Sequence, residues 1–283
     1  ITAASPGATL TLYANEVLPV ITLNKSITLI GDSTEKTLSL GANGNMFNIT
    51  AGTLTLDNYV TLQGRSTNNS PVVNVASGGS LVMKSGSKIT GNSTTGTGTG
   101  GVRVQGGSFT MEGGTISNNI GSNVSDTGGG VRVDSGSFSM SGGTISGNYC
   151  GNDGGGVWVN SGSFTMTGGT ISGNTSRNGG GGVWVNSSGS FTMTGGIISG
   201  NTSQGTAGGS GGGGVSPVGN NSFTKSGGGI IYGNDVNDPL RNIDSTGRGH
   251  AVFRYSNGPH RHATLWEADN ISTSNLSSPP WDQ

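Results

Sequence analysis

The sequence has few charged residues and almost no cysteine. Of its 283 residues, 10% are charged, and the formal net charge is −1. A general nucleic-acid binder uses an excess of positive charge against the phosphates, so this near-neutral balance predicts no nucleic-acid partner. The single cysteine, Cys150, excludes an internal disulfide and supplies no metal cluster. We therefore expect neither a metal nor a cofactor.

Long apolar runs and proline are also scarce. No run of apolar residues is long enough for a membrane-spanning helix, so no transmembrane segment is expected. Only 8 residues are Pro, whereas 57 are Gly without a Gly-X-Y period, which argues against collagen. No signal peptide begins at Ile1, so we expect the chain to be a mature or trimmed form of a longer protein.

The glycines belong to an internal repeat. One unit, residues 128–148, reads GGGVRVDSGSFSMSGGTISGN, and the next, residues 154–174, reads GGGVWVNSGSFTMTGGTISGN. Phenylalanine marks the register of the repeat, and aliphatic residues continue the series upstream. The marks are Ile27, Leu54, Leu81, Phe109, Phe138, Phe164, Phe191 and Phe223. These marks predict about eight coils of roughly 27 residues each.

Apolar and polar residues alternate within each unit. In Val131-Arg132-Val133 the valines share one face, and Phe138 and Met140 share a face a few residues later. Each unit thus contains three short strands, separated by turns in which Gly permits positive φ. One unit cannot bury its apolar face alone, but stacked units can. The sequence predicts an all-β fold, a right-handed, single-stranded parallel β-helix with three short strands per coil.

The chain divides where the repeat ends. We expect the β-helix to occupy residues 1–234, most regularly over 100–234, and residues 235–283 to form a C-terminal cap and tail. All three histidines lie in this tail, and the His260-Arg261-His262 motif lacks a third ligand, so it predicts no metal site. Loop length varies mainly between the Asn that ends a unit and the glycines that begin the next, at residues 120–127, 149–153 and 202–210. Loops of this kind commonly carry function.

An asparagine ends each third strand. Stacked amides can form a hydrogen-bonded ladder, and Asn also favours turns, so we interpret these residues as structural. They are Asn92, Asn119, Asn148, Asn174, Asn201 and Asn234.

Two columns of outward side chains are the most unusual exterior feature. If the valines point inward, one column contains Arg103, Arg132, Trp158 and Trp184, and the other contains Gln105, Asp134, Asn160 and Asn186. Exposed indoles offer a flat platform for sugar rings, and the neighbouring polar groups can bind hydroxyls or a uronate carboxylate. We expect both columns except Gln105 to bind the ligand. Alternatively, the indoles only stabilise the sheet or lie beneath a loop or the tail.

Evidence for catalysis is weaker. A glycosidase needs two carboxylates, whereas the repeats contain only Glu112, Asp126, Asp134 and Asp153. Asp134 and Arg132 are the best candidates for acid and base roles, and Asp126 and Asp153 lie in successive loops where they can approach each other. Outward hydroxyl rows such as Ser163-Thr165-Thr167 resemble the ice-binding faces of some antifreeze proteins, although Glu112 and Lys84 interrupt the face.

The unit GGGVWVNSGSFTMTGGTISGN resembles the GGxI/GGxxxxN repeats of bacterial surface β-helix proteins. These include spirochaete repeat proteins and chlamydial polymorphic outer-membrane proteins, and the expected fold resembles the pectate-lyase-like β-helix superfamily. The resemblance covers roughly residues 100–235 and is weaker over 20–99. It implies a secreted or cell-surface protein but no activity, because fold does not fix function.

Three hypotheses follow. The first is a monomeric, adhesin-like module that binds polysaccharide along the Arg/Trp column. The second is a polysaccharide-degrading lyase or glycoside hydrolase that uses the same surface. The third is a structural or ice-binding solenoid.

Overall fold

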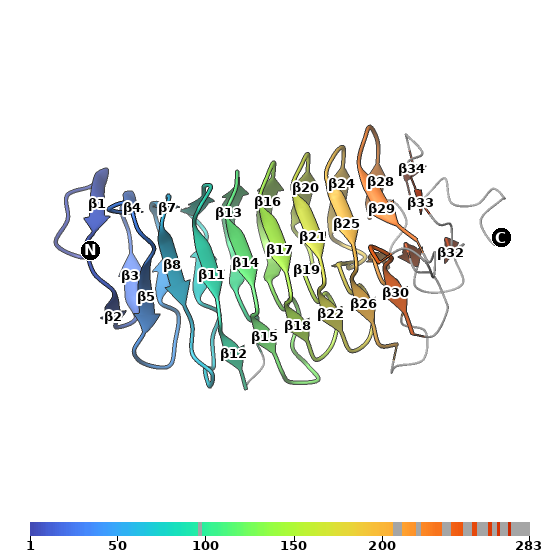
Figure 1. Cartoon of the computed structure of the whole chain (residues 1–283), viewed down its shortest axis with the longest axis horizontal. Coiled ribbons are helices and arrows are strands. Elements are labelled where there is room, and N and C mark those ends of the chain that lie inside the picture. Colours follow the sequence, from blue (N-terminus) through green and yellow to red (C-terminus); the bar gives the residue numbers. More distant parts are fainter. Residues whose placement is uncertain are drawn as a thin grey trace.

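The structure is a computed structural model. It describes residues 1–95, 98–205, 211–218, 222–233, 239–245 and 251–253, and the short strands at 260–261, 265–266 and 271–272. The described residues contain no helix, and their parallel strands stack as a solenoid of about seven turns with about 27 residues per turn (Figure 1). The predicted parallel β-helix is confirmed, with about one turn fewer than the register marks suggest. Among these residues no helix is long and apolar enough to cross a membrane.

The strands form three sheets. The largest sheet contains β1 (Ala8–Leu12), β3 (Ile21–Leu23), β4 (Ile27–Gly31), β6 (Phe47–Ile49), β7 (Gly52–Leu56), β9 (Val73–Ala76), β10 (Gly79–Met83), β13 (Val102–Met111), β16 (Val131–Met140), β19 (Val157–Val159), β20 (Ser163–Met166), β23 (Val183–Val185), β24 (Ser190–Met193), β27 (Val215–Pro217), β28 (Phe223–Lys225), β31 (Val252–Phe253), β32 (His260–Arg261) and β34 (Ile271–Ser272). The second sheet contains β2 (Glu16–Leu18), β5 (Lys36–Leu40), β8 (Val60–Gln63), β11 (Lys88–Thr90), β14 (Thr115–Ser117), β17 (Thr144–Ser146), β21 (Thr170–Ser172), β25 (Ile197–Ser199), β29 (Ile230–Tyr232) and β33 (Leu265–Trp266).

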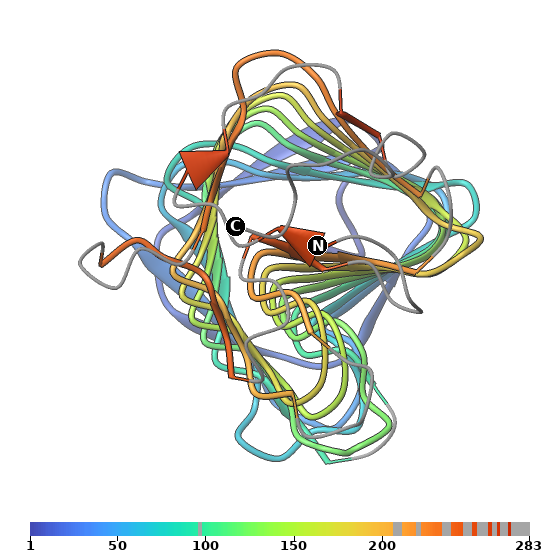
Figure 2. The same cartoon turned by 90° about the vertical axis from the view of Figure 1, so that its right-hand side faces the viewer.

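The third sheet consists of two-residue strands that the sequence did not predict. Its members are β12 (Ser93–Thr94), β15 (Ile120–Gly121), β18 (Tyr149–Cys150), β22 (Thr175–Ser176), β26 (Thr202–Ser203) and β30 (Ile243–Asp244). Each of β15, β18, β22 and β26 begins directly after the Asn that ends its unit, in the segments interpreted as loops. A regular coil therefore contains the three expected strands and a short fourth one, and the coils superpose when viewed along the solenoid axis (Figure 2).

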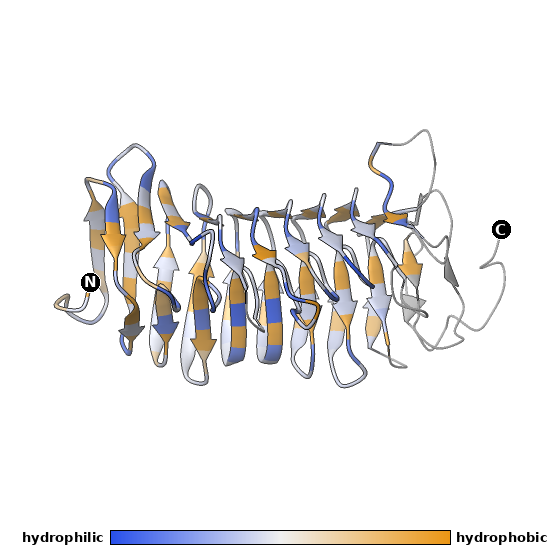
Figure 3. Ribbon diagram, turned by 90° about the horizontal axis from the view of Figure 1, so that it is seen from below, coloured by the Kyte–Doolittle hydropathy of each residue, from blue (hydrophilic) through white to orange (hydrophobic). Residues whose placement is uncertain are grey.

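The core consists of side chains stacked one per coil. Phe138 pairs in register with Phe109 on one side and Phe164 on the other, and the ring centroids are 4.6 Å apart in both pairs. Each of the three rings is only 1% exposed. Hydrophobic and hydrophilic bands alternate along the strands of successive coils (Figure 3). The columns predicted from the repeat period are therefore present in the fold.

A buried ladder of asparagine amides runs beside the core. Asn148 Nδ2 donates to Asn174 Oδ1 at 2.9 Å, and Asn174 Nδ2 donates to Asn201 Oδ1 at 2.9 Å. Asn201 Nδ2 then donates to Asn242 Oδ1 at 3.0 Å. The sequence predicted Asn234 as the last member, but Asn234 lies outside the described residues and Asn242 occupies this position. Because buried amides need partners, the ladder explains why the third strand ends in Asn.

Strand pairing continues beyond the regular repeats. Strand β30 pairs in parallel with β26, and β31 pairs in parallel with β27. Three strands of the tail then pair antiparallel: β32 with β31, β33 with β29, and β34 with β28. His250 and His262 lie outside the described residues. The division at residue 234 stays a prediction.

Candidate functional site

The outward column is continuous along the large sheet. Register pairing joins Asn48 to Asn74, Asn74 to Arg103, Arg103 to Arg132, Arg132 to Trp158, Trp158 to Trp184, and Trp184 to Ser216. Each member lies between two residues that point into the core; for example, Val102 and Val104 flank Arg103 and are fully buried. The alternation of the strand therefore directs all of these side chains to the outside of the coil.

The two indoles do not form an open platform. Only 9% of Trp158 and 8% of Trp184 is exposed, although neither belongs to the hydrophobic core. The glycine-rich segment before β23 packs against the Trp184 ring, and the segment before β19 passes close to the Trp158 Cβ atom. A Cβ atom on Gly179 would lie 2.3 Å from Trp184 Cζ3, and one on Gly154 would lie 2.8 Å from Trp158 Cβ. The expectation of an exposed tryptophan surface is therefore wrong: both indoles are buried, with Gly179 packed against the Trp184 ring and Arg132 over the Trp158 ring.

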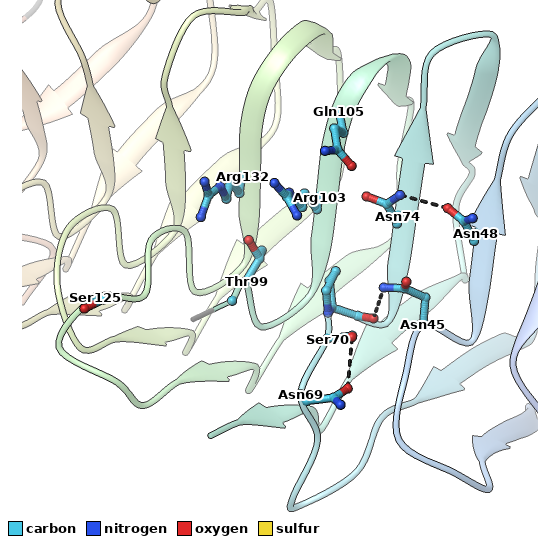
Figure 4. A pocket seen from close by; sticks show the side chains of 12 residues that line it. Asn45, Asn48, Asn69, Ser70, Asn74, Thr99, Arg103, Gln105, Ser125 and Arg132 are labelled. Atoms are coloured by element: carbon cyan, nitrogen blue, oxygen red, sulfur yellow. Dashed lines mark hydrogen bonds between the residues drawn. The ribbon is translucent and has the colours of Figure 1, made fainter. Parts of the chain in front are cut away.

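The same column borders a groove on the N-terminal side of the tryptophans (Figure 4). The groove has a volume of about 540 Å³. Strands β6, β9, β13 and β16 supply Asn48, Asn74, Arg103 and Arg132, and the remaining lining residues are Asn45, Asn69, Ser70, Pro71, Gly98, Thr99, Gln105 and Ser125. Several of these come from the segments between the short sheet and the large one. Two guanidinium groups and no carboxylate line the groove among the described residues.

Asp134 joins the two arginines. Arg103 Nε donates to Asp134 Oδ2 at 2.6 Å, and Arg132 Nε donates to Asp134 Oδ1 at 2.7 Å. The side chains are 34%, 21% and 13% exposed for Arg103, Arg132 and Asp134 respectively. On its other side, the Arg132 guanidinium carbon lies 4.9 Å from the centroid of the Trp158 ring. Arg132 is thus held between a carboxylate and an aromatic face.

A β-bulge at Asp134 changes the second predicted column. Val104 pairs with Val133, but the next residue, Gln105, pairs with Ser135, so Asp134 has no partner on β13. The expectation that Gln105 stands beside Asp134 is therefore wrong, because the extra residue of a bulge shifts the register. Further along, Asn186 Nδ2 donates to Asn160 Oδ1 at 2.9 Å, outside the set of residues that line the groove.

The sequence interpretation missed the two amides on the groove wall. Asn74 Nδ2 donates to Asn48 Oδ1 at 2.8 Å, while Asn74 Oδ1 is buried without a hydrogen-bond partner. The sequence does carry a signal for them, because Phe47-Asn48-Ile49 and Val73-Asn74-Val75 alternate in the same way as Val102-Arg103-Val104. The weaker repeat over 20–99 concealed this continuation of the column.

Asp126 and Asp153 lie in adjacent coils, but outside the lining of the groove. Burial raises the pKa of Asp126. Hydrogen bonds from Gly98 N–H and Asn123 N–H lower this pKa, but burial has the larger effect. Burial also raises the pKa of Asp153 to about 6, against a hydrogen bond from Gly179 N–H. Burial is the main reason why the pKa of the Cys150 thiol is raised to about 12. The nearby Asp153 and Asp126 carboxylates also raise it.

The groove wall presents side-chain amides, hydroxyls and guanidinium groups, all of which can form hydrogen bonds. Both oxygens of Asp134 accept hydrogen bonds from arginine, and among the described residues no carboxylate lines the groove wall. Among the residues that the structure describes, no group of three or more His, Cys, Asp or Glu side chains is placed to hold a metal ion.

Comparison with known proteins returns no relative. No family model matches the sequence, and neither a curated protein nor a solved structure matches the chain.

Proposed function

We propose that this protein binds a polysaccharide in the groove between Asn48 and Arg132. The observation that carries this proposal is a groove of about 540 Å³ whose wall presents side-chain amides and guanidinium groups from four successive strands. These polar groups recur at the strand spacing of roughly 4.8 Å. A sugar residue in an extended glycan advances by a similar distance, so successive hydroxyls can meet successive coils.

The proposed setting follows from the resemblance of the repeat to bacterial surface β-helix proteins. We propose a secreted or cell-surface module that acts as a monomer and in the manner of an adhesin. Trp158 contributes to binding indirectly. Its ring packs against the Arg132 guanidinium group, and little of the ring is exposed to a ligand.

The test compares two amide pairs with similar geometry. On the groove wall, Asn74 Nδ2 donates to Asn48 Oδ1 at 2.8 Å. Outside the groove, Asn186 Nδ2 donates to Asn160 Oδ1 at 2.9 Å. Calorimetric titration with the best glycan from an array should show that the double variant Asn48→Ala/Asn74→Ala loses at least about tenfold in affinity, since each lost hydrogen bond costs about 1 kcal/mol. The variant Asn160→Ala/Asn186→Ala should bind as the wild type does. Equal losses in the two variants, or no glycan bound at all, would contradict the proposal.

The enzyme alternative has less support. Asp134 as an acid would have to release two arginines, and among the described residues the groove wall offers no partner carboxylate. Incubation with the glycans that bind should release no new reducing ends and no unsaturated products.

Ice binding has one observation in its favour. A second outward column of the large sheet contains Thr110, Ser139, Thr165, Thr192 and Thr224 in register. If the protein binds ice, the wild type should show thermal hysteresis, and Thr165→Tyr should abolish it. Zero hysteresis in the wild type would exclude ice binding.

A further inference from the structure

We infer that the arginine end of the groove selects an anionic sugar, and that Asp134 is a positioning residue that aims both guanidinium groups at it. This inference rests on the proposed function and specifies the class of ligand. The chemistry that would be recognised is a planar carboxylate or a sulfate ester carried on the glycan.

Both arginines keep hydrogen-bond donors that no described part of the protein uses. Arg103 and Arg132 each use Nε for one oxygen of Asp134. Within the described part of the chain, the Nη atoms of both arginines make no hydrogen bond, and both side chains line the groove (Figure 4). The Nη groups of a guanidinium form the fork that pairs with carboxylate and sulfate oxygens. The pair therefore presents donors to the groove in the geometry that an oxyanion requires.

The lining of this end of the groove is positively charged. Two cations and no carboxylate line it among the described residues. Asp134 balances only one of the two charges. Asp126 attracts Arg132 through space, but its carboxylate is fully buried and accepts hydrogen bonds from Gly98 N–H and Asn123 N–H. The exposed charge that a ligand meets is positive.

The guanidinium group of Arg132 is held in place on two sides. On one side, Arg132 Nε donates to Asp134 Oδ1 at 2.7 Å. On the other side, Arg132 Cζ lies 4.9 Å from the centroid of the Trp158 ring. The bulge leaves Asp134 without a register partner on β13, and its carboxylate accepts one hydrogen bond from each arginine. Preorganised donors lose less conformational entropy on binding than free ones do.

The experiment titrates the intact protein with three probes of matched chain length: oligogalacturonate, dextran sulfate and neutral dextran. We expect at least one anionic probe to bind at least about tenfold more tightly than neutral dextran, as a charge-assisted pair adds roughly this much. The tighter of the two anionic probes identifies carboxylate or sulfate as the recognised group. The preference should weaken as salt is added, because the arginines are partly exposed.

Two sets of variants assign the preference to the arginines. Arg103→Gln/Arg132→Gln should remove the anionic preference, so that the anionic probes bind no more tightly than neutral dextran does. Arg103→Lys keeps the charge but lacks the fork, so it should lose part of the preference. Lys88→Gln removes one positive charge from the second sheet, outside the groove, and should leave the anionic preference unchanged. Circular dichroism and thermal unfolding serve as controls to check that each variant is folded.

Asp134→Asn separates positioning from simple charge. This substitution raises the local positive charge, so a site that works by net charge alone would bind anions more tightly. If Asp134 positions the guanidinium groups, the variant instead binds anions more weakly, and Asp134→Glu restores part of the preference. Tighter anion binding by Asp134→Asn would overturn the positioning role. Equal binding of all three probes would overturn the anionic preference while the proposed function stands, and no binding of any glycan would defeat both.

Discussion

Phe138 and Phe164 stack face to face with ring centroids 4.6 Å apart and planes within 6°, although they lie in different repeats. Their strands are register partners in the large sheet. The same relationship holds between Phe164 and Phe191 at 4.5 Å, so the Phe164 ring is stacked between two others. The stability of the solenoid depends on these columns, because no coil buries its apolar face by itself.

Removal of one ring should therefore be costly. Phe164→Ala is expected to lower the free energy of unfolding by about 3–5 kcal/mol, the usual range for a buried aromatic residue. Thr165→Ala, on the outward side of the same strand, should cost less than about 1 kcal/mol. Denaturant titration measures both. Equal small effects would show that Phe164 is not in the core.

The asparagine ladder gives a second prediction. Asn174→Ala removes the acceptor of both the Asn148 side chain and the Asn148 N–H, at 2.9 and 3.0 Å. We expect a loss of at least about 2 kcal/mol, since two buried donors are left without partners. Asn186→Ala provides the control, because it breaks a less buried amide pair and should cost under about 1 kcal/mol. If the two substitutions cost the same, the ladder does not stabilise the fold.

The sequence predicted these columns because the period places identical residues on top of one another. Val131, Phe138 and Ile145 recur in each strong repeat, and alternation separates inside from outside within each strand. The short fourth strand could not be predicted, since two-residue strands such as Thr175–Ser176 have no periodicity of their own. The ladder position of Asn242 was also hidden, because the last regular spacing does not hold beyond Asn201.

The candidate site was only partly predictable, because it depends on features that alternation does not encode. The direction of Arg103, Arg132 and both tryptophans follows from the strand pattern. The burial of Trp184 depends instead on how the glycine-rich segment before β23 packs against its ring. The bulge at Asp134 also has no signal in the repeat.

The close approach of Gly179 to Trp184 is itself testable. A Cβ at this glycine would lie 2.3 Å from the ring, so Gly179→Ala should destabilise the protein by about 1–3 kcal/mol through overpacking. In a Trp184→Ala background the same substitution should cost much less, which a double-mutant cycle measures. Gly228→Ala meets no atom within 4 Å and serves as the control. Additive effects of Gly179→Ala and Trp184→Ala would contradict the packing of glycine against the indole.

Asp153 predicts a dependence of stability on pH. Its pKa is raised from 3.8 to about 6 in the folded chain, so the folded state binds this proton more tightly than the unfolded state does. The wild type should therefore gain stability relative to Asp153→Asn as the pH falls through about 6, and the gain should be complete near 3.8. Its size is at most about 3 kcal/mol.

Asparagine keeps an acceptor for Gly179 N–H but carries no charge, so it isolates the titration. Thermal unfolding at pH 8 should show Asp153→Asn to be more stable than the wild type, and the difference should vanish near pH 4. A constant difference across this range would show that Asp153 does not titrate with a raised pKa.

The most direct test of the stacked coils is a distance that grows with coil number. Thr28 is connected by register through Thr55, Val82 and Thr110 to Ser139, and from there through Thr165 to Thr192. Spin labels on cysteines at 28 and 139, in a Cys150→Ser background, should lie about 19 Å apart, and labels at 28 and 192 about 29 Å apart, at roughly 4.8 Å per strand. Pulsed electron paramagnetic resonance measures both distances. Narrow distributions near these values are the predicted result, and equal distances in the two pairs, or broad distributions, would contradict the columns on which the groove is built.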